Sequence, residues 1–314
     1  MAFLLVASGL VLLVLAGDFL VKGAVGMSLR LGVPTLIVSV SIVGFGTSAP
    51  EMLIAVQSAL EGAPGLALGN VVGSNTANVL LVLGLPAMLY TLDTSASNTK
   101  RIYLMMIGVS VIFVALSFLG PLHFWHAIVL LSLLAAMLWD NLRSAMSTRN
   151  GSGADLAAVE GIRYNMPGWR MAMYIFGGMI GLPLGAQLMI EGSLIIAERF
   201  GLGHEIIGLT FVAIGTSLPE LATTAVAAMR READVALGNV IGSNMFNLLA
   251  IMGVTSLFGP LPVAANFLEL DLWIMLGASA LLGIFVYSKM RMGRLWGVAF
   301  LGLYVVYMVY LLGR

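Results

Sequence analysis

The sequence contains no cysteine and few charged residues. The absence of cysteine excludes disulfides, thiolate chemistry and cysteine metal ligands. Charged residues make up 10% of the 314 residues and hydrophobic residues 60%, whereas soluble globular proteins have roughly 25% charged and 45–50% apolar residues. The formal net charge is zero and no long basic run occurs, so nothing in the composition indicates a nucleic acid partner. This composition predicts a chain that resides in a lipid bilayer.

The apolar residues fall into long runs that polar, Pro or Gly residues separate. One helical crossing of a bilayer needs about 20 predominantly apolar residues. The first run starts at the N-terminus with no basic region or cleavage site, which indicates a retained first helix. The expected spans lie near residues 2–22, 35–59, 66–90, 102–119, 123–140, 170–196, 206–229, 236–258, 270–288 and 295–312. The predicted fold class is an all-α polytopic membrane protein with about ten transmembrane helices.

The basic residues predict how these spans are oriented. When the loops are numbered along the chain, the odd-numbered ones hold every lysine and arginine except Arg199 and the terminal Arg314. Cytoplasmic loops of membrane proteins carry the excess of basic residues. We therefore expect a multi-pass protein with both termini outside the cytoplasm. The polar stretch 143–168, which contains Asn-Gly-Ser-Gly, is expected to be a flexible cytoplasmic connector.

Two sequence motifs each occur twice. GTSAPE at residues 46–51 recurs as GTSLPE at 215–220, and ALGNVVGSNTAN at 67–78 recurs as ALGNVIGSNMFN at 236–247. Each copy belongs to a set of five spans, an odd number, so the second set must enter the membrane from the opposite side. This predicts a first inverted repeat at 1–142, the connector at 143–168 and a second inverted repeat at 169–314. Inverted repeats place ion sites near the midplane, on interrupted helices.

Glu51 and Glu220 are the only acidic residues within the four motif-bearing spans, and no lysine or arginine accompanies them there. A carboxylate buried in hydrocarbon is costly unless a cation, a proton or hydrogen-bond donors compensate it. An intramembrane ionisable residue is therefore a functional site by default. The expected partner of this duplicated pair is a cation or a proton from outside the protein.

Oxygen-bearing residues accompany both glutamates. Thr47 and Ser48 lie about one helical turn before Glu51, so their hydroxyls and the carboxylate converge. Pro50 has no N–H, so it leaves the carbonyl of Gly46 without its helical partner and kinks the helix.

The second motif adds amide oxygens. Ser74 and Asn78 are spaced i, i+4, as are Ser243 and Asn247, so each pair presents a hydroxyl and an amide along one helix face. Oxygen ligands without sulfur or imidazole suit Ca²⁺ or Na⁺ rather than Zn²⁺ or copper.

Several residues also have a purely structural interpretation. Serine and threonine in membrane helices commonly bond to their own backbone, and closely spaced glycines form a helix-packing pattern, so any one of these residues alone fits a structural role. Asp18 and Lys22 are spaced as an ion pair on one helix. His123, His126 and His204 fall at expected span ends, and the 20 methionines fit apolar filler.

The GTSxPE and GNxxGSNxxN segments resemble the two alpha repeats of the calcium/cation antiporter superfamily, and the whole chain resembles the short prokaryotic form of the sodium/calcium exchanger family. The resemblance implies a prokaryotic plasma membrane protein of ten helices, in which spans 1 and 6 slide against a core of spans 2, 3, 7 and 8. The cation ligands that it implies are Thr47, Ser48, Glu51, Ser74, Asn78, Thr216, Ser217, Glu220, Ser243 and Asn247, with the backbone carbonyls of Gly44 and Ala213. Many family members carry Asp where this chain has Asn247, so a third possible carboxylate is missing.

We therefore predict a secondary antiporter, with no enzymatic activity and no cofactor, that exchanges Ca²⁺ for Na⁺ by alternating access. Two carboxylates balance one Ca²⁺ or two Na⁺, and a third Na⁺ would leave a dry site positively charged. Proton coupling, and transport of another hard divalent cation such as Mn²⁺, remain alternatives.

Three other classes of membrane protein can be compared with this pattern. An uncoupled cation channel would use the same oxygen ligands. An intramembrane hydrolase has little support, because no hydrolase motif accompanies the two carboxylates. A purely structural membrane protein would have no use for a duplicated buried carboxylate. The oligomeric state stays open, since a monomer suffices for transport.

Overall fold

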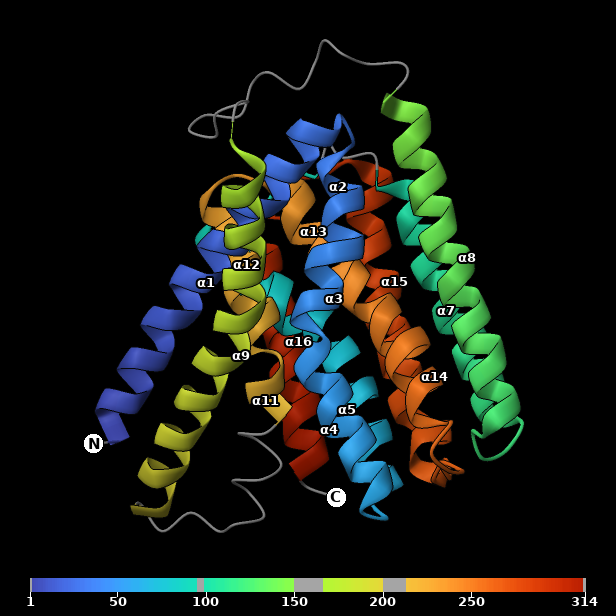
Figure 1. Ribbon diagram of the computed structural model, residues 1–314. Helices are drawn as coiled ribbons and strands as arrows, with labels where there is room; N and C mark the ends of the chain where they lie inside the picture. Colours follow the sequence, from blue (N-terminus) through green and yellow to red (C-terminus); the bar gives the residue numbers. More distant parts are fainter. Residues whose placement is uncertain (1, 95–98, 150–165, 200–212, 313–314) are drawn as a thin grey trace.

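A computed structural model describes residues 2–94, 99–149, 166–199 and 213–312 of the chain. Within these ranges, eight helices are long and apolar enough to cross a membrane, and a bent pair of shorter helices makes a ninth candidate. The span expected at 206–229 is described only from residue 213 onward, and His204 and most of the 143–168 connector lie outside the described residues. The helices form one bundle (Figure 1), which confirms the all-α multi-span fold class.

The first half contains five spans. They are α1 (Ala2–Leu31); the bent span of α2 (Thr35–Val38), the π-helical segment η1 (Ser39–Val43), α3 (Gly44–Thr47) and α4 (Ala49–Leu60); the span of α5 (Pro64–Ala77), η2 (Asn78–Leu83) and α6 (Gly84–Leu89); α7 (Lys100–Phe118); and α8 (Phe124–Arg149).

The second half repeats this order. It consists of α9 (Gly168–Arg199); α11 (Ala213–Thr216) with α12 (Leu218–Met229); the span of α13 (Ala233–Phe246), η4 (Asn247–Ile251) and α14 (Met252–Thr255); η5 (Phe267–Asp271) with α15 (Leu272–Ser288); and α16 (Arg294–Leu312). The π-helical segments η2 and η4 begin at Asn78 and Asn247, which occupy the same position in the two repeats.

Two helices are longer than the apolar runs predicted. α1 continues past residue 22 to Leu31, and α8 continues past residue 140 to Arg149, into the stretch expected to be a flexible connector. A helix satisfies its own backbone hydrogen bonds, so it does not have to end where polar side chains begin. In α1 the expected pair of Asp18 and Lys22 is confirmed, with 2.6 Å between the carboxylate and the ammonium group.

The two halves are arranged in opposite directions. Both chain ends lie at the same end of the bundle (Figure 1), so α1 and α9 cross it in opposite senses. At one end a backbone bridge joins Leu92 to Met292, and at the other end a second bridge joins Leu122 to Leu261. Leu92 and Leu261 are equivalent residues of the two repeats, so the bridges are inverted copies of each other.

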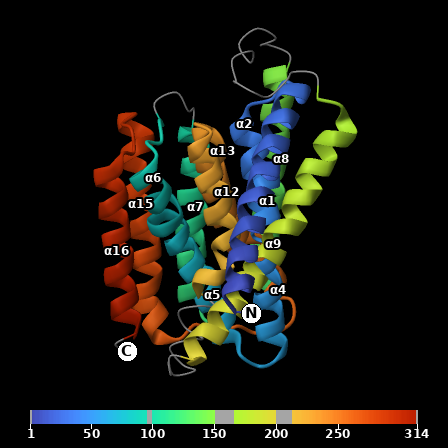
Figure 2. The same cartoon turned by 90° about the vertical axis from the view of Figure 1, so that its left-hand side faces the viewer.

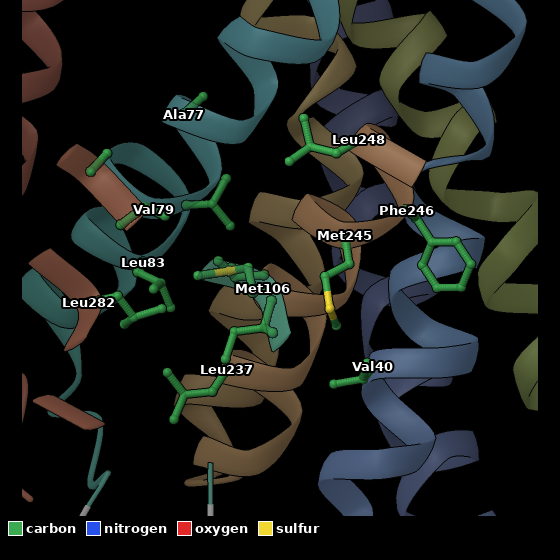
Figure 3. Close-up of a cluster of buried hydrophobic side chains, with 14 of the residues drawn as sticks. Val40, Ala77, Val79, Leu83, Met106, Leu237, Met245, Phe246, Leu248 and Leu282 are labelled. Atoms are coloured by element: carbon green, nitrogen blue, oxygen red, sulfur yellow. The ribbon is translucent and has the colours of Figure 1, made fainter. Parts of the chain in front are cut away.

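The centre of the bundle is made of the motif-bearing helices. The most apolar stretch of the α13–η4–α14 span is entirely buried and that of the α5–η2–α6 span is 72% buried, whereas that of α16 is only 22% buried. Side chains from both halves, including Leu83 of η2, Met106 of α7 and Leu237 of α13, belong to one buried cluster (Figure 3). The repeats therefore share this core, and a second buried cluster, with Leu13 of α1 and Leu182 of α9, lies between α1 and α9.

Helices α1 and α9 pack along each other in close contact. A Cβ on Gly9 would lie 2.7 Å from the carbonyl oxygen of Gly185, so glycine permits the two backbones to approach. In the second view α9 lies at the edge of the bundle opposite α16 (Figure 2). The two helices that the family resemblance assigns to sliding thus form a pair beside the core.

Candidate cation site

Each glutamate of the repeated motif lies directly after a break in its span. Ser48 separates α3 from α4, and the two parts of this span are bent by 44°. Ser217 separates α11 from α12 in the same way. Pro50 and Pro219 fall in the first turn of the helix after each break, where a missing N–H costs nothing. The predicted kink is therefore confirmed, and it places a carboxylate in the first turn of α4 and of α12.

Glu51 and Glu220 are both fully buried, and their carboxyl groups interact with each other. Neither carboxylate oxygen of Glu51 accepts a hydrogen bond from the described residues, and the same holds for Oε2 of Glu220. Oε1 of Glu220 has one long contact, at 3.5 Å, from the Ser243 hydroxyl. Two buried carboxylates with so few donors among the described residues require a cation or protons.

The ion pairs in the described part of the chain lie elsewhere. They link Asp18 with Lys22 and Arg230, Asp140 with Arg101, and Asp93 with Arg291, all with partly exposed side chains. None of these pairs includes Glu51 or Glu220. The carboxylate pair therefore has no protein counter-charge among the described residues.

Hydroxyl groups from both halves meet beside Glu220. The Thr47 hydroxyl lies 3.0 Å from the Ser243 hydroxyl and donates to Oδ1 of Asn239 at 3.1 Å. The Gly44 carbonyl oxygen accepts from Thr47 and Ser243 at 3.3 and 3.4 Å. The first repeat thus contributes α3 to a site whose other wall is α13 of the second repeat.

Glycine makes this approach of α3 to α13 possible. A Cβ on Gly44 would lie 2.9 Å from the backbone of Gly242, and one on Gly242 would lie 2.5 Å from the Val40 carbonyl oxygen. In the other repeat, Gly73 occupies the position of Gly242, and the segment equivalent to Ser39–Val43 is residues 208–212, which lie outside the described residues. The structure therefore describes this close crossing at Gly242.

Amide side chains complete the site. Asn78 and Asn247 are fully buried, and the Oδ1 atom of each has no hydrogen-bond partner among the described residues. Their amide nitrogens donate to the asparagines of the opposite repeat, Asn244 and Asn75, at 3.0 Å in both cases. Each predicted ligand amide therefore has a bonded nitrogen and an unpaired oxygen.

The remaining predicted ligands belong to the same motif-bearing helices and their breaks. The hydroxyls of Ser48 and Ser217 are buried without a partner among the described residues, and Ser74 is 3% exposed. The Thr216 hydroxyl contacts Oδ1 of Asn70 at 3.4 Å. Ala213 is the first residue of α11.

Three further asparagines take part that the sequence analysis did not assign. Asn75 and Asn244 hold the ligand amides, and Asn239 donates to the Glu220 carbonyl oxygen at 3.2 Å and to Thr224 at 3.0 Å. All three lie in the repeated GNxxGSNxxN motif, so their duplication was a signal that pointed to them.

The donor set is made of carboxylate, amide and hydroxyl oxygens. The described residues contain no group of three or more His, Cys, Asp or Glu side chains that would hold a metal ion, so two carboxylates must be supplemented by neutral oxygens. Such oxygen-only sites fit hard cations such as Ca²⁺ and Na⁺.

A bundle of inverted halves that meet at buried, oxygen-bearing broken helices defines a multi-span membrane transporter of ions. The profile of the family described as sodium/calcium exchanger protein matches residues 1–141 and 171–313. The chain belongs to this family and is a cation exchanger.

Relatives of similar length match nearly the whole chain. The sodium/calcium exchanger MaX1 of Methanosarcina acetivorans is 32% identical, with 98% of each sequence covered. The putative antiporter CaxA of Alkalimonas amylolytica is 33% identical over 94% of this chain and 91% of its own length, and the inner membrane protein YrbG of Escherichia coli is 29% identical over 99% and 97%. The structure of the sodium-calcium exchanger NCX_Mj soaked with Na⁺ and Sr²⁺ superimposes with a TM-score of 0.83 at 30% identity, covering 98% of this chain and 97% of that one.

Proposed function

We propose that this chain exchanges Ca²⁺ for Na⁺ across a prokaryotic inner membrane by alternating access. The observation that carries the proposal is the pair of buried carboxylates, Glu51 and Glu220, which come from opposite repeats and have no protein cation beside them among the described residues. Their two negative charges match one Ca²⁺ or two Na⁺, so either occupant neutralises the site.

The ligands in this proposal are the oxygens of Thr47, Ser48, Glu51, Ser74, Asn78, Thr216, Ser217, Glu220, Ser243 and Asn247, with the carbonyls of Gly44 and Ala213. In the described state the Gly44 carbonyl is held by two hydroxyls, so a cation that binds it displaces at least one of them. The name of MaX1 and the ions in the NCX_Mj crystals support Na⁺ and a divalent cation as the exchanged pair.

The inverted relation of the two repeats supports alternating access. The repeats carry the same motifs, so exchanging their two conformations produces a state that opens to the other side of the membrane. In this mechanism the α1 and α9 pair slides along the core.

The topology in this proposal puts both termini outside the cytoplasm. Figure 1 shows the chain ends at one end of the bundle. The start of α7, with Lys100 and Arg101, and the segments between α12 and α13 and between α15 and α16, which also carry basic residues, lie at the other end. Basic residues gather in cytoplasmic loops. The division into repeats at 1–142 and 169–314 with a connector between them is part of the same proposal.

The test is uptake of radiolabelled Ca²⁺ into proteoliposomes that contain the purified protein. Vesicles loaded with Na⁺ and diluted into Na⁺-free buffer should take up Ca²⁺ with saturable kinetics, and vesicles without a Na⁺ gradient should not. Uptake driven by a pH gradient alone would identify protons as the counter-ion. Uptake without any counter-ion gradient would identify a channel, and no Ca²⁺ uptake under either gradient would contradict Ca²⁺ exchange.

A further inference from the structure

Two asparagines at equivalent positions of the repeats bind each other reciprocally. Nδ2 of Asn75 donates to the backbone carbonyl of Asn244 at 3.2 Å, and Nδ2 of Asn244 donates to the backbone carbonyl of Asn75 at 3.3 Å. Both side chains are 1% exposed. This exchange ties the last turn of α5 to the last turn of α13.

Each of these asparagines also holds one amide of the candidate site. Oδ1 of Asn244 accepts from Nδ2 of Asn78, and Oδ1 of Asn75 accepts from Nδ2 of Asn247. Every one of the four bonds therefore has a symmetric copy in the other repeat. The links cross between repeats, because Asn75 holds the amide of the second repeat and Asn244 that of the first.

The backbone decides which way all four amides face. A carbonyl oxygen only accepts, so the end of Asn75 that faces the Asn244 carbonyl must be the NH₂ group. The Oδ1 atom of Asn75 then faces Asn247, and Asn247 must donate to it with its own NH₂ group. A flipped amide at any step would bring two acceptors, or two donors, into contact. The same sequence of steps runs from the Asn75 carbonyl through Asn244 to Asn78.

This orientation leaves the Oδ1 atoms of Asn78 and Asn247 unpaired among the described residues. A buried acceptor without a donor is unfavourable, and a cation that binds the oxygen removes this cost. A flipped amide would instead present its NH₂ group and repel a cation. The π-helical segments η2 and η4 begin at these same two residues, and such segments are frequent at functional sites.

We propose that Asn75 and Asn244 are positioning residues that orient the amides of Asn247 and Asn78 so that both present an oxygen to the transported cation. The inference rests on the proposed cation site. It also connects Asn75 with the identity of residue 247, since a carboxylate at 247 has no N–H to donate to Asn75 Oδ1. The hydrogen bond to Asn75 Oδ1 therefore requires an asparagine, and not an aspartate, at position 247.

The test is a set of double-mutant cycles read by isothermal titration of Ca²⁺ into the purified full-length protein in Na⁺-free detergent solution. Asn75→Ala keeps the backbone carbonyl that orients Asn244, so only Asn247 loses its anchor. We expect Ca²⁺ affinity to fall about 2- to 10-fold, the range for one hydrogen bond. In the Asn247→Ala background the same change should have almost no further effect, and in the Asn78→Ala background it should have its full effect. Asn244→Ala should show the opposite pattern.

Equal losses from Asn75→Ala in all three backgrounds, with wild-type protein that binds Ca²⁺, would overturn the positioning role alone. Wild-type protein that binds no Ca²⁺ would overturn the proposed function and this inference together.

A second background tests the same hydrogen bond by an isosteric change at residue 247. In Asn247→Asp the carboxylate opposes Asn75 Oδ1, so adding Asn75→Ala should leave Ca²⁺ affinity unchanged or raise it. A loss of Ca²⁺ affinity as large as that caused by Asn75→Ala in the wild-type background would contradict the proposal that Asn75 orients the amide of Asn247. Melting of each variant without Ca²⁺ separates loss of affinity from loss of folding.

Discussion

The hydroxyl of Thr47 lies 3.0 Å from the hydroxyl of Ser243, although the two residues are 196 positions apart and belong to opposite repeats. Thr47 also bonds to Asn239, which in turn donates to the backbone of Glu220. One hydroxyl of the first repeat is therefore part of the environment of the glutamate of the second.

Replacing Thr47 by valine tests this connection. Thr47→Val keeps the shape of the side chain and removes its hydroxyl, so Asn239 and Ser243 each lose a partner. We expect an apparent Ca²⁺ affinity about 2- to 10-fold weaker in proteoliposome uptake, because a buried hydrogen bond contributes about 0.5–1.5 kcal/mol. Thr47→Ser retains the hydroxyl and should stay within a factor of two of wild type. Equal affinities for Thr47→Val and wild type would show that the hydroxyl has no part in binding.

Neutralising either buried glutamate should abolish exchange. Glu51→Gln and Glu220→Gln preserve side-chain volume but leave one negative charge to balance a divalent ion, so we expect no measurable Ca²⁺ flux while the protein still elutes as a folded species. Glu61→Gln is the matched control, since Glu61 is exposed at the end of the same helix, α4, where it accepts from Gln57. Full Ca²⁺ flux in either buried variant would remove the basis of the proposed site.

Alanine at Gly242 should destabilise the described conformation. A Cβ at Gly242 would meet the Val40 carbonyl oxygen at 2.5 Å, so Gly242→Ala forces α13 away from η1 and should lower the melting temperature. Gly108→Ala in α7 is the matched control, because a Cβ there meets nothing within 4 Å among the described residues and alanine favours a helix over glycine by about 1 kcal/mol. Thermal melts of both variants without Ca²⁺ or Na⁺ make the comparison. Equal destabilisation would contradict the close crossing at Gly242.

Much of this fold follows from patterns along the chain. Apolar runs located the spans, and the repeat of Glu51 at Glu220 predicted both the inverted halves and the two carboxylates of the site. Helix ends were predicted less well, because α8 continues past residue 140 to Arg149. Polar side chains just beyond residue 140 have partners in other helices, as Ser144 has in Arg101 and Asn141 has in Ser41. Hydropathy records where apolar residues stop, whereas a helix stops where its backbone bonding stops.

The detailed site could not be predicted, because it depends on contacts between residues far apart in sequence. Spacing placed Ser74 and Asn78 on one helix face, but nothing in a single helix reveals that Asn78 donates to Asn244 of the other repeat. Likewise, the duplicated motif indicated that Gly242 lies in a helix contact, but the sequence did not reveal that Gly44 of α3 is the residue opposite it.

An ion pair joins α1 to the end of α12, and exchanging the charges of its two residues tests its contribution to stability. Asp18 pairs with Lys22 on its own helix and also with Arg230. Arg230→Asp would place two carboxylates side by side, so we expect a destabilisation of up to about 1 kcal/mol, the usual range for a partly exposed pair. Asp18→Arg combined with Arg230→Asp should restore most of the loss. The melting temperature in low and high choline chloride measures the effect, which should shrink as salt screens it; an effect independent of salt would contradict an electrostatic origin.

Exchange by a site with two carboxylates should carry no net charge. One Ca²⁺ or two Na⁺ neutralise Glu51 and Glu220, whereas a third Na⁺ would leave an uncompensated positive charge where the dielectric constant is low. We therefore expect two Na⁺ for each Ca²⁺, and a potential imposed with K⁺ and valinomycin should not change the rate of Na⁺-driven Ca²⁺ uptake. Asn247→Asp adds a third carboxylate and provides the contrast, since it should allow a third Na⁺ and make uptake respond to the imposed potential. Wild-type uptake that varies steeply with potential would mean that a further charge crosses the membrane with each cycle, and that Asn247 does not limit the number of sodium ions.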